Sequence, residues 1–133
     1  MKLKRVIYEL YEVDLGSLHD HPEWHEIDRE IILEFDNGEK RYFSWCNEPV
    51  QYSVGVQEHR FNVNEPDHVI DASEWDMWRG LIGNEVDFIS HNGSNQILEL
   101  RGQNSSVYLS SQERGSWLAD VLHISITLPE FGS

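Results

Sequence analysis

Apolar and polar residues alternate along several short stretches of the chain, and this period of two constrains the fold more than any other feature of the sequence. The clearest case is the pair of segments 27–35 and 40–46, which both carry alternating apolar side chains. Asn37 and Gly38 lie between them, and this dipeptide favours a tight turn because Asn tolerates a positive φ and Gly adopts one freely. The sequence therefore predicts an antiparallel hairpin here.

The same alternation predicts further strands, in the residue ranges 3–13, 50–56, 86–90, 96–101, 106–111 and 120–128. Residues 14–26 contain a glycine, a proline and four acidic residues, and we expect them to form a loop. One helix interrupts the strands. Ser73 is its predicted N-cap, and Trp75 and Trp78 fall three residues apart on the face expected to pack on a sheet.

Many short strands with a single helix predict an α+β fold class that is mainly antiparallel β, with a sheet or half-barrel of about seven to eight strands and one helix packed on it. The length of 133 residues predicts one domain spanning 1–133. Residues 32–35 and the strand after them are similar to residues 97–100 and their following strand. This similarity has two interpretations, an internal duplication or two hairpins built on one common pattern.

The single cysteine, Cys46, excludes an internal disulfide framework and a Cys-rich zinc site. Basic residues near the N-terminus resemble the start of a secretory signal, but acidic residues soon interrupt the apolar stretch that such a signal needs. We therefore expect a cytoplasmic protein in which Cys46 is a free thiol.

The chain has an unusually negative charge. Ten Lys and Arg against 24 Asp and Glu give a formal net charge of −14. Nucleic-acid binding requires basic groups that displace counterions from phosphates, and anionic membrane surfaces attract basic segments for the same reason. We therefore expect neither a nucleic acid nor a membrane as partner. A basic protein partner stays open, and so does an acidic surface that serves solubility alone.

Motifs of several common enzyme classes are absent from the sequence. The chain has no Gly-x-Ser-x-Gly elbow, no glycine-rich phosphate loop and no His-Glu-x-x-His pair. His21, Pro22 and Glu23 match the first half of a zinc-deaminase signature, but the second half needs two cysteines and the chain has one. We expect a protein that is not an enzyme.

Histidines and carboxylates are concentrated in residues 19–26, which hold three of each. His19 and His21 point to the same side of an extended chain, as two ligands of one metal ion must. A metal- or small-ligand-binding β-barrel that uses His19, His21 and His25 is therefore one hypothesis. The other is an exposed polar loop, and we adopt it, so that no metal and no cofactor are expected.

Acidic residues gather in two parts of the chain, and both contain tryptophan. From Glu9 to Glu39 there are eleven acidic residues and one basic residue, Arg29, while a second cluster extends from Glu65 into the predicted helix. Carboxylates around an aromatic ring suit an interface with a basic protein, because charge speeds the encounter and the ring supplies buried contact. The partner-binding residues that we predict are Glu23, Trp24, Glu26, Asp28, Glu30, Asp67, Asp71, Glu74 and Asp76.

The tryptophans in these clusters have a second interpretation. Trp75 and Trp78 fit the apolar face of an amphipathic helix, where at least one of them is expected in the core. Trp24 lies in the predicted polar loop and is therefore the better candidate for an exposed anchor.

A small, very acidic, sheet-rich chain without a catalytic motif resembles the immunity proteins that neutralise bacterial toxins delivered between competing cells. The layout of residues 78–86, 97–100 and 107–109, in which a helix end leads to a strand and a hairpin, is similar to that of several such proteins. The resemblance implies a protein that covers the active site of a cognate toxin, often a nuclease, with acidic residues standing in for phosphates. The basic protein partner is then the toxin.

Overall fold

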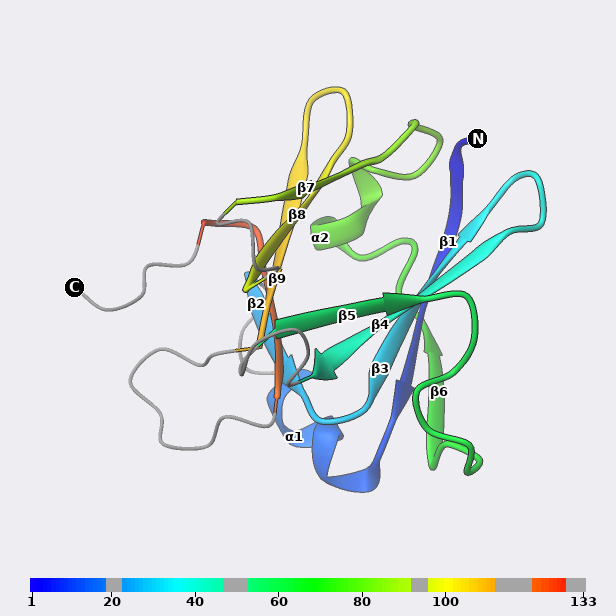
Figure 1. The fold of residues 1–133 in the computed structure, drawn as a ribbon, viewed down its shortest axis with the longest axis vertical. Helices are drawn as coiled ribbons and strands as arrows, with labels where there is room; N and C mark the ends of the chain where they lie inside the picture. Colours follow the sequence, from blue (N-terminus) through cyan, green and yellow to red (C-terminus); the bar gives the residue numbers. More distant parts are fainter. Residues whose placement is uncertain (19–22, 47–52, 92–95, 112–120, 129–133) are drawn as a thin grey trace.

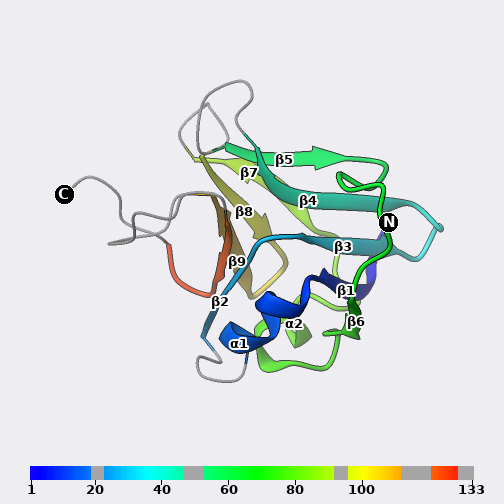
Figure 2. The same cartoon turned by 90° about the horizontal axis from the view of Figure 1, so that it is seen from below.

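The computed structural model describes residues 1–18, 23–46, 53–91, 96–111 and 121–128. Within these residues, ten strands form two antiparallel sheets of five strands each (Figure 1). The two sheets lie face to face and enclose the apolar side chains that alternate along their strands (Figure 2).

The first sheet has the strand order β5-β4-β3-β1-β6. The predicted hairpin forms β3 and β4, with Gly38 at a positive φ of 87° in its turn. Strand β1 lies against β3 in a register that places Val6 opposite Leu33 and Tyr8 opposite Ile31. The strands of this sheet are β1 Leu3–Leu10, β3 Glu30–Phe35, β4 Lys40–Cys46, β5 Ser53–Gln57 and β6 His68–Asp71.

The second sheet has the strand order β2-β10-β9-β8-β7. Strand β2 pairs with β10 at its edge, although β2 lies in the sequence between two strands of the first sheet. The chain therefore leaves the first sheet after β1, adds a strand to the second and returns. The strands of the second sheet are β2 Trp24–Ile27, β7 Asp87–Ser90, β8 Ile97–Arg101, β9 Ser106–Ser110 and β10 Leu122–Ser125.

The expectation of a mainly antiparallel β protein with little helix is confirmed, but its finer form is wrong. Two five-stranded sheets replace the single sheet or half-barrel. The segment 14–26, expected as a loop, contains α1 (Leu15–Leu18) and three of the four residues of β2, and β6 was not expected at all. Each of these strands has four residues and is stabilised by a strand far away in the sequence, β10 for β2 and β1 for β6. The two similar hairpins, β3-β4 and β8-β9, lie in different sheets.

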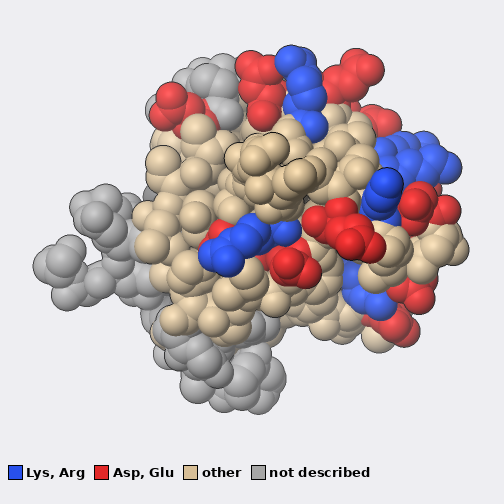
Figure 3. Space-filling model, turned by 90° about the horizontal axis from the view of Figure 1, so that it is seen from above, with Lys and Arg blue, Asp and Glu red and all other residues tan. Residues whose placement is uncertain are grey.

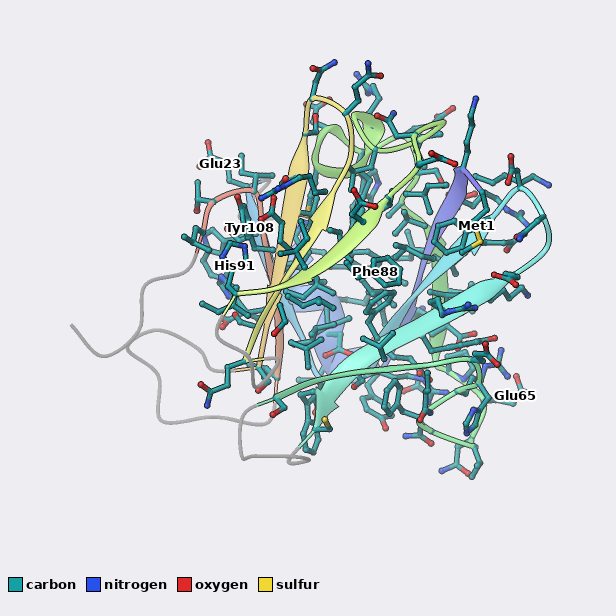
Figure 4. All side chains as sticks on the ribbon, turned by 45° about the horizontal axis from the view of Figure 1, so that its top comes forward. Met1, Glu23, Glu65, Phe88, His91 and Tyr108 are labelled. Carbon is teal, nitrogen blue, oxygen red and sulfur yellow. The ribbon has the colours of Figure 1, made fainter. Side chains whose placement is uncertain are left out.

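Aromatic rings connect the two sheets, from the buried Phe35 and Phe43 to the partly exposed Phe88. Phe88 of β7, labelled in Figure 4, has its ring centroid 5.5 Å from that of Phe43 in β4 and 6.4 Å from that of Phe35 in β3. Edge and tilted contacts of this kind add about 0.5–1.5 kcal/mol each to the free energy gained by burial. The rings therefore fix how one sheet sits on the other.

Among the described residues, three short helical segments connect the strands, η1 Glu12–Asp14, α1 Leu15–Leu18 and α2 Asp76–Arg79. The predicted apolar face of α2 is confirmed, because Trp78 and Leu81 are buried and Trp75 is half-buried. The predicted N-cap is wrong. Trp75 precedes the helix instead, and Ser73 Oγ accepts a hydrogen bond of 2.9 Å from the Val6 N–H. None of the helices described here has the length and apolar character that crossing a membrane requires.

Candidate binding groove around Trp75

The first predicted acidic residues lie on and beside β2, at the edge of the second sheet. Glu23 is exposed, and its backbone carbonyl accepts a hydrogen bond of 3.2 Å from the Ile126 N–H. Trp24 is half-buried and stacks on the His123 ring with 5.6 Å between centroids, while Glu26 Oε2 lies 3.3 Å from His123 Nδ1. Trp24 therefore lies in β2 and packs on His123 of the adjacent strand β10. It is not an exposed anchor in a loop.

Two further predicted residues of this cluster, Asp28 and Glu30, are partly or fully buried. Asp28 is half-buried, and its Oδ1 accepts a hydrogen bond of 3.2 Å from Trp45 Nε1–H. Glu30 has 0 % of its surface exposed, and it accepts a hydrogen bond of 3.0 Å from the Phe61 N–H. Burial raises the pKa of Glu30 above its usual value. Glu30 does not lie on the surface that the prediction requires, because segment 58–66 covers it.

The histidine cluster is described only in part, since His19 and His21 lie outside the described residues. His25, on β2, is 3 % exposed and faces the interior. In the part of the chain that the structure describes, no group of three or more His, Cys, Asp or Glu side chains is arranged to hold a metal ion.

The acidic residues of the second cluster lie in two separate places, one before β6 and one between the end of β6 and the start of α2. Asp67 precedes β6, and its Oδ2 accepts a hydrogen bond of 3.0 Å from the Glu12 N–H. Asp71 ends β6, Glu74 follows it, and Asp76 begins α2; all three are exposed. These last three carboxylates border two hollows in the surface that meet at Trp75.

The first hollow has a volume of about 480 Å³ and lies between α1, β2, β6 and α2. Leu18, Ile70 and Met77 form its apolar wall, and His25 and Trp75 also line it. Its charged rim consists of Glu74, Asp76 and Arg79. A concave apolar surface with a few polar groups at fixed positions is the usual form of a binding pocket.

The second hollow, of about 450 Å³, shares Glu74 and Trp75 with the first and adds Arg5, Asp71 and Ser73. Asp71 Oδ1 accepts a hydrogen bond of 3.0 Å from the Ser73 N–H. Hydrogen bonds from the Ser73 side chain and backbone lower the pKa of Asp71, so its carboxylate stays charged. We call the two hollows together the Trp75 groove.

A buried hydrogen-bonded cluster supports the first hollow. Trp78 Nε1–H donates to Tyr8 Oη over 2.9 Å, and Tyr8 Oη lies 3.1 Å from His25 Nδ1 and 3.9 Å from Met77 Sδ. Because an imidazole nitrogen is a stronger acceptor than a thioether, the Tyr8 hydroxyl donates to Nδ1. His25 is then neutral with its proton on Nε2. Burial lowers the pKa of His25 to about 4, and the imidazole of His123 contributes a smaller lowering.

Basic side chains are largely neutralised within the protein. Every arginine among the described residues lies within ion-pair distance of a carboxylate, namely Arg5, Arg29, Arg41, Arg60, Arg79 and Arg101. The face in Figure 3 carries both signs of charge side by side, so the acidic surplus is not gathered there. Glu23 and Glu65 lie on opposite sides of the molecule in Figure 4, whereas Glu12 of the first sequence cluster and Asp67 of the second are joined by a hydrogen bond of 3.0 Å.

A charged cluster on the second sheet was not predicted from the sequence. The buried Glu99 carboxylate accepts hydrogen bonds from Arg101 Nε–H (2.8 Å) and Ser106 Oγ–H (2.5 Å), and it lies 2.6 Å from His91 Nε2. The bond from Arg101 is the main cause that lowers the pKa of Glu99 to about 2. Glu99 and Arg101 lie two residues apart on β8, whereas His91 and Ser106 reach them only through the pairing of β8 with β7 and with β9. None of them lines the Trp75 groove.

Comparison with known proteins finds no matching family model, no matching curated protein and no matching solved structure. The Trp75 groove and the charge of the chain are therefore the features that bear on its function.

Proposed function

We propose that this chain is a non-enzymatic acidic binding protein, an immunity protein that neutralises a basic toxin by covering its active site. The observation that carries the proposal is the Trp75 groove, where the exposed carboxylates of Asp71, Glu74 and Asp76 border a half-buried tryptophan. An aromatic side chain surrounded by groups that complement a partner's charge is the usual composition of a binding hot spot.

Charge and aromatic surface have separate roles in this proposal. The net charge of −14 attracts a basic partner over a distance and raises the association rate by ~10–10³-fold at low salt. Trp75 lies with its ring centroid 5.2 Å from that of Tyr8 and 5.4 Å from that of His25, so it is held in position before a partner arrives. Such preorganisation reduces the side-chain entropy lost on binding.

The resemblance to immunity proteins supports the nature of the partner. A toxin that acts on nucleic acid needs a basic groove for phosphates. The carboxylates of the Trp75 groove would occupy such a groove in place of the phosphates. A cytoplasmic protein of this kind, which itself binds neither nucleic acid nor membrane, would meet the toxin after its delivery.

Co-expression tests the proposal. The probe is the toxin encoded by the gene immediately upstream, produced in a bacterial host under an inducible promoter. We expect the wild-type chain to restore growth and to co-purify with the toxin. Growth arrest in the presence of the folded chain contradicts the proposal, and so does the lack of any toxin gene beside this one.

A matched pair of variants locates the binding surface. The double variant Glu74→Lys/Asp76→Lys reverses two charges of the Trp75 groove, and Glu58→Lys/Glu85→Lys makes the same change in net charge at exposed residues that do not line it. We expect the first variant to lose protection and the second to keep it. Equal protection by both would show that the groove is not the binding surface.

The first hollow also favours one alternative, the small-ligand form of a metal- or small-ligand-binding β-barrel that uses His19, His21 and His25. His25 lines the cavity, and the proton on its Nε2 is a donor with no partner among the described residues. Elemental analysis of the untagged wild type and of His21→Ala tests the metal form of this alternative. A metal bound by the wild type and lost in the variant would support the alternative and displace the proposal.

A further inference from the structure

Strand β6 forms the edge of the first sheet and pairs with β1 alone among the described strands. Val69, in its middle, is 60 % exposed. Proteins usually protect such an edge with proline, lysine or a bulge, because unpaired backbone groups at an edge pair with other chains. The four residues of β6 include no proline and no lysine, and their register with β1 is continuous. This edge is open to strand addition.

Hydrogen bonds between β1 and the segment 67–72 show which backbone groups of β1 face β6. The Val6 carbonyl accepts from the Ala72 N–H over 2.8 Å, and the Leu10 carbonyl accepts from the Asp67 N–H over 3.0 Å. Both carbonyls therefore point toward β6. Because backbone groups alternate in direction along a strand, the residue midway between Val6 and Leu10 points the same way.

That midway residue is Tyr8, which lies opposite Ile70. The N–H and C=O groups of Ile70 therefore face β1. The same alternation turns the N–H and C=O groups of Val69 and Asp71 outward, away from the sheet. An added strand finds donors and acceptors at both positions.

The Trp75 groove flanks this edge on both faces of the sheet. Ile70 and Asp71 are successive strand residues, so their side chains point to opposite faces. Ile70 lines the first hollow and Asp71 lines the second, and Glu74 borders both. Successive side chains of a strand added to β6 would therefore reach the two hollows in turn, the arrangement in which backbone bonds give affinity and alternate pockets give specificity.

Charge selects the occupant of the edge. Asp67 precedes β6, Asp71 ends it and Glu74 follows, while Arg79 lines the first hollow and Arg5 the second. The carboxylates outnumber the two arginines, and this surplus favours a segment with Lys or Arg. A second copy of this chain, paired antiparallel through the same edge, would bring Asp67 of one copy beside Asp71 of the other. Like charges in such positions are destabilising.

We propose that the basic partner adds an extended, lysine- or arginine-bearing segment to the free edge of β6 and places successive side chains in the two hollows of the Trp75 groove in turn. The inference rests on the proposed function and specifies how its partner is held.

The test uses the full chain labelled with ¹⁵N and a short capped peptide in which lysine and valine alternate. We expect binding to shift the amide signals of Val69 and Asp71 and the indole signal of Trp75, and to slow hydrogen exchange at the two amides. The charge-reversed peptide, in which glutamate replaces lysine, should cause none of these changes. Binding of both peptides alike, or no change at millimolar lysine peptide, would overturn the inference.

Two substitutions at one site test the backbone contact. Val69→Pro removes an N–H that faces away from β1, so it deletes no bond within the sheet, whereas Val69→Thr keeps the donor. We expect Val69→Pro to weaken binding of the lysine peptide by about tenfold or more and Val69→Thr to change it by less than about twofold. Equal affinities in the two folded variants would refute strand addition. If Val69→Pro does not fold, the hydrogen exchange of the wild type with peptide decides.

The outcomes separate this inference from the proposed function. Sedimentation that shows a dimer broken by Val69→Pro would assign the edge to a second copy and overturn the inference. A Val69→Pro variant that protects fully against the toxin also overturns it, while leaving the proposed function intact. If the Glu74→Lys/Asp76→Lys variant neutralises the toxin as well as the wild type does, the Trp75 groove would instead be removed from the proposed function.

Discussion

The side chain of His25, on β2, contacts the buried core on one side and lines the Trp75 groove on the other. Its Nδ1 accepts from the buried Tyr8 hydroxyl, and its ring lies edge-on to Trp75 with 5.4 Å between centroids. A protonated imidazole could not accept that hydrogen bond and would carry a charge into an apolar interior. The neutral form of His25 is therefore a condition of the folded state.

This requirement predicts how stability depends on pH. The pKa of His25 is about 4 in the folded protein against 6.5 in the unfolded chain, so the unfolded state takes up its proton first as the pH falls. Stability is then lost between pH 6.5 and pH 4, by about 2–3 kcal/mol at the lower end. His25→Asn keeps an acceptor near Nδ1 and does not titrate, so it should lack this part of the loss.

Urea unfolding of the wild type and of His25→Asn at pH 7 and pH 4 measures the difference. The wild type should lose more stability than the variant over this interval. The same loss in both proteins would mean that His25 is protonated in the folded state and that the hydrogen-bond assignment is incorrect.

The contrast between Asp71 and Glu30 shows what the sequence could predict at this scale. The acidic residues that became part of the groove, Asp71, Glu74 and Asp76, were found from local charge alone. Glu30 has the same chemistry and a similar neighbourhood in the sequence, but it lies opposite Glu9 across β1 and β3. Its burial depends on that pairing and on the segment that covers it, and both are contacts between residues distant in the sequence.

At the scale of elements, segment 58–66 neutralises a pair of like charges on the first sheet. Arg60 donates two hydrogen bonds to the Glu9 carboxylate, of 2.8 and 2.7 Å, and the Phe61 N–H donates to Glu30. Glu9 is 3 % exposed, so its charge depends on Arg60 for compensation. The segment between β5 and β6 is thereby fixed to the strands beside the free edge.

Arg60→Ala should destabilise the protein by about 2–3 kcal/mol, because it leaves a buried carboxylate without its partner beside Glu30. Arg41→Ala is the matched control, since Arg41 pairs with the partly exposed Glu39 and the largely exposed Glu58, and pairs of this kind contribute less than about 1 kcal/mol. Chemical denaturation of both variants compares them. A loss for Arg60→Ala no larger than the control's would show that Glu9 is stable without Arg60.

The elements differed in how far the sequence could predict them. The hairpin of β3 and β4 was predictable because Asn37 and Gly38 indicate a turn between two segments in which apolar and polar residues alternate. Strands β2 and β6 were not, because each has four residues and is stabilised by a partner far away in the sequence, β10 for β2 and β1 for β6. The edge on which the further inference depends was therefore visible only in the structure.

At the scale of the whole molecule, the acidic surplus and the Trp75 groove lead to one claim, that net negative charge directs a basic partner to the surface formed by β6 and α2. The composition predicts a basic partner. It does not indicate where that partner binds, because Glu12 and Asp67 bring the two acidic clusters together in the fold, and only Asp71, Glu74 and Asp76 border the Trp75 groove.

The rate of association with the toxin, measured by stopped flow from low to high ionic strength, tests this claim most directly. We predict that the wild-type rate falls by ~10–10³-fold as salt screens the charges. Glu74→Lys/Asp76→Lys should associate slowly at low salt and depend less on ionic strength, whereas Glu58→Lys/Glu85→Lys should stay close to the wild type. A wild-type rate that is independent of salt, or two variants with the same rate, would contradict the claim.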